Sequence, residues 1–239
     1  MIANQPPRPS NMQNIVAINQ GRRPFTWDVP VCSPLAPEAA QEFVRAGGAA
    51  LDTRSPADFG KAHIAGAVNI QLSSSEFEQR VGWMLTDETG MVLVADDLDA
   101  ARAATRKLAF VGLDQRVRGV VSLTAWRAGG LPVASLAQIS VDELSRALES
   151  GSLKVLDVRE SSEWQAGHIA SAHHMSFKQL PQRMRELPFR LQEGIAVICA
   201  TGKRSSTACS VLLASGYPHV LNVTGGMTAW KEAGLPADG

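Results

Sequence analysis

Two stretches of the chain share one pattern: residues 51–70 read LDTRSPADFGKAHIAGAVNI, and residues 156–175 read LDVRESSEWQAGHIASAHHM. Seven of the twenty positions are identical, at an offset of 105 residues. A second pair, TAWRAGGLP at 124–132 and TAWKEAGLP at 228–236, shares six of nine positions at an offset of 104. A repeat of about 100 residues has the size of a domain rather than of a short solenoid unit. The 239-residue chain is therefore predicted to contain two related domains.

The boundaries follow from where the repeat begins and ends. We expect a tail at residues 1–31, a first copy at 32–134 and a second copy at 135–239, joined by a linker at Pro132–Gln138. The tail is rich in Pro, Asn and Gln and has no counterpart in the second copy, so it is predicted to be mostly extended.

Each copy alternates expected strands with expected helices. In the second copy the capping box Ser140–Glu143 opens a helix that runs to about Ser150. The other elements expected there are strands at Lys154–Val158, Ile195–Ile198 and Val220–Val223, and helices at Phe177–Leu187, 205–215 and Met227–Ala233. The first copy is expected to have the same order of strands and helices. This order predicts the α/β class, with two tandem domains that each have a mainly parallel sheet and helices on both faces.

A candidate reactive loop follows the buried strand Ile195–Ile198, where residues 199–204 read CATGKR. Ligands of a parallel sheet bind beyond the carboxyl ends of its strands. Backbone N–H groups of such a loop form an anion cradle, and the next helix adds partial positive charge at its N-terminus. Gly202 permits the tight curvature, and Ser205 or Ser206 is expected to cap the helix.

The three cysteines are expected to differ in role. The cradle, the helix and the cations Lys203 and Arg204 all favour the thiolate of Cys199, which is the nucleophilic form. Cys209 lies in an apolar helix and is expected in the core. Cys32 lies between prolines and is expected to be exposed or loosely packed.

Four motifs, which follow one another along the second copy, carry a resemblance to a known family. They are LDVR at 156–159, GHIASA at 167–172, the CxxGxR loop and GGMTAW at 225–230. Over about residues 35–239 the chain resembles tandem rhodanese-type sulfurtransferases. Its loop differs from the CGxGVT loop of mercaptopyruvate sulfurtransferases, which disfavours 3-mercaptopyruvate as donor. The C-x4-R spacing is also shorter than the C-x5-R loop of cysteine phosphatases, and this favours one sulfur atom over a phosphoryl group.

The resemblance implies a thiosulfate sulfurtransferase with a ping-pong mechanism. Cys199 would take the outer sulfur of a small anionic donor, thiosulfate or a persulfide, and a thiol or cyanide would accept it. The resemblance implies that Cys199 and Arg204 are catalytic and that Ala200, Thr201, Gly202 and Lys203 bind the substrate, with the cations of Lys203 and Arg204 attracting the anionic donor. Arg159 is a further candidate for donor binding, with a structural pair to Asp157 as the alternative. No metal or organic cofactor is implied.

The first copy has no cysteine at the matching place and carries Asp96, Asp97 and Asp99 there. Carboxylates would repel an anionic donor, so this copy is expected to be structural or to dock a partner. In contrast, the second copy has no Asp or Glu from Gly194 to Lys231, which predicts a positive field that steers anions to Cys199.

Composition narrows the remaining possibilities. Lys and Arg number 23 and Asp and Glu also 23, which argues against a nucleic-acid or membrane partner. The absence of a secretory signal pattern and of a long apolar run predicts a cytoplasmic protein. Two alternatives remain open. One is a sulfur-relay or docking module, because the tail and tandem domains resemble the C-terminal part of fusions with a metallo-β-lactamase-fold persulfide dioxygenase. The other is a redox sensor built on Cys199.

Overall fold

The computed structural model describes residues 9, 11–26, 32–85 and 89–238, which fall into two compact units. The first unit contains the described residues up to Ser55 together with His63–Ala134. The second contains Pro56–Ala62 and the described residues from Ser135 onward. A short segment of the first copy thus packs with the second copy, at α3 (Pro56–Lys61), where the Leu136 N–H donates to the Gly60 carbonyl over 3.0 Å.

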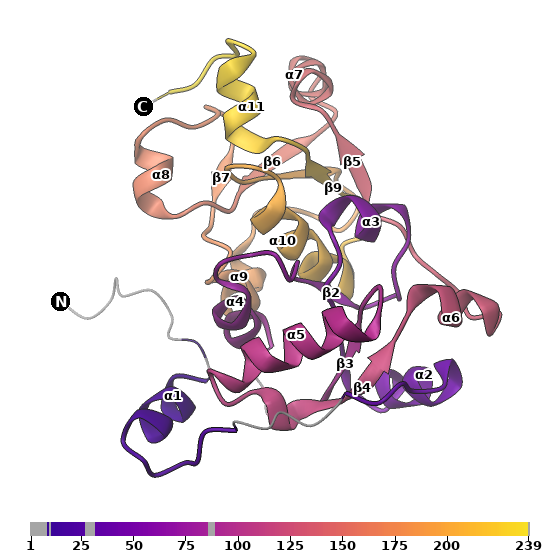
Figure 1. Ribbon diagram of the computed structural model, residues 1–239. Helices are drawn as coiled ribbons and strands as arrows, with labels where there is room; N and C mark the ends of the chain where they lie inside the picture. The colour runs from indigo at the N-terminus through magenta and orange to yellow at the C-terminus, as the bar shows by residue number, and fades with distance from the viewer. Residues whose placement is uncertain (1–8, 10, 27–31, 86–88, 239) are drawn as a thin grey trace. The chain divides into compact units, whose positions relative to one another are not determined.

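The sheet of the first unit has the order β2-β1-β3-β4, and all neighbouring strands are parallel. Its strands are β1 (Ala49–Asp52), β2 (Val68–Asn69), β3 (Met91–Val94) and β4 (Val117–Val121). Its helices are α1 (Met12–Asn19), α2 (Pro37–Arg45), α4 (Phe77–Met84), α5 (Leu98–Ala109), the 3-10 turn η1 (Asp114–Arg116) and α6 (Leu123–Ala128) (Figure 1).

The sheet of the second unit has the order β5-β9-β8-β6-β7, again parallel throughout. Its strands are β5 (Ala137–Ile139), β6 (Lys154–Asp157), β7 (His173–His174), β8 (Ile195–Ile198) and β9 (Val220–Val223). Its helices besides α3 are α7 (Val141–Glu149), α8 (Ser161–Gln165), α9 (Leu180–Arg183) with the 3-10 turn η2 (Met184–Glu186), α10 (Lys203–Ala214) and α11 (Gly226–Glu232). The predicted α/β class with helix-flanked parallel sheets is confirmed.

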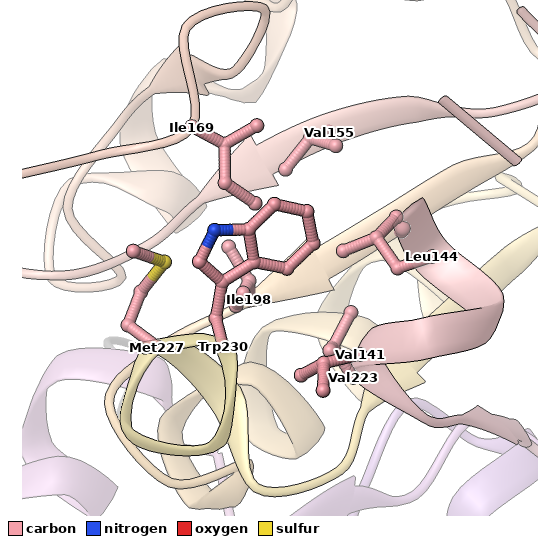
Figure 2. Close-up of a cluster of buried hydrophobic side chains, with 9 residues drawn as sticks. Val141, Leu144, Val155, Ile169, Ile198, Val223, Met227 and Trp230 are labelled. Atoms are coloured by element: carbon pink, nitrogen blue, oxygen red, sulfur yellow. The ribbon is translucent and has the colours of Figure 1, made fainter. Parts of the chain in front are cut away.

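Successive side chains along each strand of the second sheet point to opposite faces, so the sheet has a hydrophobic layer on each side. One face packs against α7 and α11, and α10 covers the other face (Figure 1). Figure 2 shows the first layer, in which Trp230 of α11 lies among Val155 and Ile198 of the sheet and Leu144 of α7. The Trp230 indole N–H donates to the Pro236 carbonyl at 2.9 Å, so its one polar group is paired although the ring is buried.

Several predicted details differ from the structure. The region expected to be an extended tail contains α1, because Met12–Asn19 lacks proline, and the Asn14 amide donates to the Gly112 carbonyl. The predicted helix Phe177–Leu187 is shorter and splits into α9 and η2, with Pro181 near its start. Cys32 was expected to be exposed or loosely packed. It is 6% exposed and so not on the surface, but it lines a cavity of about 340 Å³ next to Ser33, which pairs with Val120 of β4. Cys209 is fully buried, as predicted. Among the described residues, none of the helices is of a length and apolarity that would let it cross a membrane.

Candidate active site

Cys199 is the first residue after β8 and lies at the carboxyl end of the sheet, directly before the loop that leads to α10. Its carbonyl accepts from the Met227 N–H at 2.8 Å, and the Ala200 carbonyl accepts from the Thr228 N–H at 3.0 Å. The first turn of α11 therefore holds the loop backbone. Gly226 makes this close approach possible, since a Cβ there would lie 2.2 Å from the Cys199 carbonyl oxygen.

The loop turns through Gly202, which has φ +89° and precedes the first residue of α10. The predicted start of this helix was wrong by two residues: α10 begins at Lys203, and its N-cap is Gly202 rather than Ser205 or Ser206. The reason is that a left-handed glycine lets the chain enter the helix earlier than a serine cap would. Ser205 is instead buried in the first turn, where its hydroxyl is directed to other partners.

The sulfur of Cys199 has two polar neighbours within the loop and helix. The Gly202 N–H donates to Sγ over 3.2 Å, and Ser205 Oγ lies 3.4 Å from Sγ. Only 1% of Cys199 is exposed. The sulfur thus lies at the floor of a curved loop with a backbone donor aimed at it, which is the arrangement that stabilises negative charge on a sulfur atom.

Arg204 lies beside the loop, and its positive charge is paired with a carboxylate of the protein. Its two terminal nitrogens donate to the two carboxylate oxygens of Glu163 in α8, each at 2.6 Å. This bidentate bond raises the pKa of Arg204 and lowers the pKa of Glu163. The expectation that Arg204 is a free cation for the donor is therefore not what the structure shows, because α8 brings a carboxylate to it from 41 residues away.

Arg159 is held by the protein on every side. Its side chain donates to Asp157 at 2.7–3.0 Å, to the Gly167 carbonyl at 2.8 Å and to the Glu163 carbonyl at 3.1 Å. The structure thus contains the Asp–Arg pair that the sequence offered as the alternative to donor binding. The same pair recurs in the first unit between Asp52 and Arg54.

An open pocket of about 250 Å³ adjoins the loop. It is lined by Ala200, Thr228 and Met227 together with Ala166, Glu163, Lys231 and Arg159. Thr201 and Lys203 are both exposed on the loop and the helix start. Of the predicted site residues, the loop therefore brings Ala200, Gly202 and Arg204 around Cys199, while Thr201 and Lys203 face solvent.

Sequence reasoning missed three polar residues near the sulfur. Ser205 was expected only as a cap, and Asn222 and Gln138 were not singled out. Ser205 donates to Asn222 Oδ1 at 2.6 Å, and Asn222 Nδ2 donates to Gln138 Oε1 at 2.8 Å. The available signal was Asn222 itself, since a lone amide inside the buried strand VLNV requires a partner.

Two histidines of the second unit, His168 and His174, stack with Trp164. His168 lies 3.6 Å from Trp164 between ring centroids and His174 lies 4.9 Å from it. His168 Nδ1 is 3.1 Å from the Trp164 carbonyl and His174 Nε2 is 2.9 Å from the Arg159 carbonyl. These contacts point to a structural role for His168, whose counterpart in the first copy is His63.

The equivalent place in the first unit is built differently. Ala95 follows β3, and Asp97 caps α5 by accepting from the Ala100 N–H at 2.7 Å. Asp99 pairs with Arg102 at 2.9 Å. A cavity of about 630 Å³ opens there, with Asp96 among its lining residues.

Several known proteins are similar to parts of this chain. A sulfurtransferase of Allochromatium vinosum is 34% identical over 100 residues, which are 41% of this chain and 92% of that protein. A Bacillus subtilis protein, YrkF, described by its name as a candidate sulfur carrier, is 33% identical over 98 residues, and the match spans about half of its length, 52%. A rhodanese-like domain protein of Staphylococcus aureus, of known structure, is 32% identical and covers 44% of this chain and 100% of that chain, with a TM-score of 0.39.

The rhodanese-like domain family matches the chain twice, at residues 36–127 and at residues 140–233. The two matches lie in the two copies of the internal repeat, and together they include most of the chain. The chain belongs to the rhodanese family and contains two rhodanese-like domains.

Proposed function

We propose that this protein is a sulfurtransferase in which Cys199 carries a sulfane sulfur from an anionic donor, thiosulfate or a persulfide, to cyanide or a thiol. The observation that carries this proposal is the Gly202 N–H aimed at Cys199 Sγ over 3.2 Å, inside a loop held by α11. The sulfurtransferase of Allochromatium vinosum, which this chain resembles over 92% of its length, supports the same chemistry.

The reaction has two balanced halves. The Cys199 thiolate attacks the outer sulfur of thiosulfate, so a bond forms between Sγ and that sulfur while the sulfur–sulfur bond of thiosulfate breaks. Sulfite leaves with the electron pair, and the charge of the enzyme persulfide lies on the outer sulfur. Cyanide or a thiolate then attacks this outer sulfur, and the pair of the broken bond returns to Sγ.

The protein supplies electrostatics rather than a cofactor in this scheme. Backbone N–H groups of the loop receive the outer sulfur anion in place of water. The pocket beside Ala200 gives the donor or acceptor room outside the loop. Because Arg204 forms an ion pair with Glu163, the exposed side chains of Lys203 and Lys231 are expected to attract the anionic donor.

Steady-state kinetics with thiosulfate and cyanide test the proposal. We expect parallel double-reciprocal lines, because sulfite leaves before cyanide reacts. Cys199→Ser is expected to abolish turnover, whereas Cys209→Ser, in the same unit and equally buried, is expected to keep it. Intersecting lines, or an active Cys199→Ser protein with the native fold, would contradict the proposal.

A further inference from the structure

A chain of hydrogen bonds runs from Cys199 into the interior of the second unit. Ser205 is fully buried, Asn222 is 1% exposed, and the chain ends at Gln138 on the neighbouring strand β5. The Gln138 Nε2 group faces the Leu136 carbonyl at 3.5 Å, which leaves Oε1 to accept from Asn222. These contacts give the chain a consistent direction, from Ser205 through Asn222 to Gln138.

This direction constrains the one hydrogen of Ser205. Asn222 directs Nδ2 to Gln138 and therefore presents Oδ1 to Ser205, which donates to it over 2.6 Å. Ser205 then has only lone pairs to offer Cys199 Sγ at 3.4 Å. A thiol satisfies this contact by donating S–H, and a thiolate does not.

The first copy tests whether this chain belongs with the cysteine. Strand register makes Val120 the counterpart of Asn222, because each pairs with the central strand at equivalent places, Leu93 and Val197. Pro34 bridges to Val120 as Gln138 pairs with Asn222. Two residues after Leu93 and Val197 come Ala95 and Cys199.

The fourth position agrees as well, since Ala100 and Ser205 are each the third residue of the helix that follows. All four polar members are therefore replaced together, by Pro34, Ala95, Ala100 and Val120, in the copy that lacks the nucleophile. A chain of bonds that served packing alone would not need to disappear with the cysteine.

We propose that Asn222, anchored by Gln138, is a positioning residue that holds the Ser205 hydrogen away from Cys199 Sγ and so offsets part of the stabilisation that the Gly202 N–H gives to charge on Sγ. In the persulfide, Sγ is a neutral bridging atom and the charge lies on the outer sulfur within the loop. The network thus favours the sulfur-loaded state over the free thiolate. This inference rests on the proposed function.

Other groups near Cys199 must be held constant in any test. They are Lys203 and Cys209 of α10, the Arg204–Glu163 pair, the Asp157–Arg159 pair after β6, and Lys231 of α11. The strands β5 and β9 contribute no charged side chain. Substitutions at Asn222, Gln138 and Ser205 leave all of these charges in place.

The test is the pH titration of Cys199, followed through its ¹³Cβ resonance in cysteine-labelled protein. Asn222→Leu frees the Ser205 hydrogen to turn to Sγ, and we expect the titration midpoint to fall by about one pH unit, a tenfold change in the ratio of thiolate to thiol. Gln138→Leu, at a half-buried side chain, is expected to give a smaller shift in the same direction. In a Ser205→Ala background neither substitution is expected to move the midpoint.

Two results would overturn the inference: an unchanged midpoint in a folded Asn222→Leu or Gln138→Leu protein, or the same shift in the Ser205→Ala background. If Asn222→Leu does not fold, Gln138→Leu decides. The titration needs no sulfur donor, so it stands even for a protein that accepts no sulfur. A second readout, the fraction of persulfide at a fixed ratio of thiosulfate to sulfite, is expected to fall in Asn222→Leu and depends on the proposed function.

Discussion

At the scale of single residues, the site is determined by close approaches between backbone segments. The carbonyl of Cys199 and the N–H of Met227 meet because Gly226 has no side chain and adopts φ +55°. The loop then turns through a second left-handed glycine, Gly202. These two glycines therefore position the loop that holds the sulfur.

Replacing Gly226 tests this control by the backbone. In Gly226→Ala the new Cβ would lie 2.2 Å from the Cys199 carbonyl oxygen and 2.7 Å from Ala200 carbonyl atoms, so the loop must move. Gly234→Ala is the matched control, since Gly234 has φ +67° and no atom within 4 Å of such a Cβ. We expect the control to lose about 1 kcal/mol of unfolding free energy from backbone strain alone and to keep its activity.

Gly226→Ala is expected to lose more stability than the control and at least tenfold in kcat/KM. Urea unfolding and thiosulfate turnover measure the two quantities. Equal losses in the two variants would show that α11 does not hold the loop.

The Glu163 carboxylate gives a pH-dependent prediction. Its pKa is lowered, chiefly by the hydrogen bonds from Arg204. A lowered folded-state pKa means that this stabilisation is present above the ordinary glutamate value of about 4.3 and is lost as pH falls through the lower folded value. Between pH 6 and pH 3 the wild-type protein is thus expected to lose more stability than Glu163→Gln.

Urea midpoints at the two pH values check this expectation. Glu149→Gln, at an exposed residue near the end of α7, controls for removal of one charge and is expected to follow the wild type. Parallel pH dependence in wild type and Glu163→Gln would mean that the pair contributes nothing to folding.

At the scale of elements, the sequence predicted the strands β6, β8 and β9 of the second unit, missed the short strands β5 and β7, and predicted helix ends poorly. The buried strand Ile195–Ile198 was predicted at its observed limits, because a four-residue apolar run between Gly194 and a polar loop has the length of a strand rather than of a helix. The start of α10 was missed because the cap depends on the φ of Gly202, which the residue letters do not fix. Strand β5 was missed because its three residues acquire their pairing only from β9.

The candidate site shows the same division. Cys199 and the loop that curves around it follow from local sequence, whereas the carboxylate opposite Arg204 and the amide behind Ser205 come from α8 and β9. Long-range partners of this kind are determined by the packing of the elements, and no spacing in the sequence reports them.

The capping box of α7 predicts a measurable contribution of one element. Ser140 accepts from the Glu143 N–H at 3.2 Å, and the Glu143 carboxylate accepts from the Ser140 N–H at 2.7 Å. Ser140→Ala is expected to lower the unfolding free energy by about 1 kcal/mol, and Ser140→Thr, which keeps an acceptor, by much less. Thermal or urea unfolding measures both, and equal losses would contradict the assignment of the cap.

At the scale of the whole molecule, a net charge of zero hides an uneven distribution. The acid-free stretch from Gly194 to Lys231 surrounds the nucleophile, and the matching loop of the first copy carries Asp96, Asp97 and Asp99. The neutralisation of Arg204 by Glu163 leaves Lys203 as the exposed cation closest in sequence to the loop's sulfur.

Steering by Lys203 is testable through its charge. Lys203→Ala is expected to lower kcat/KM for thiosulfate by about threefold to tenfold at low ionic strength, and added salt should reduce the difference. Lys154→Ala also removes one positive charge, but at the first residue of β6, at the end of the sheet away from Cys199. It is therefore expected to have little effect. A salt-independent rate, or equal effects of the two variants, would count against steering.

The central claim is that Cys199 alone carries the sulfur. Burial raises the pKa of both Cys32 and Cys209, which disfavours the nucleophilic thiolate at either residue. The most direct measurement is mass spectrometry of the protein after thiosulfate treatment, for the wild type and for Cys199→Ala. We predict one added sulfur atom on the Cys199 peptide, removed by cyanide, and none in Cys199→Ala. Sulfur on Cys32 or Cys209, or a gain of oxygen in place of sulfur, would contradict the account.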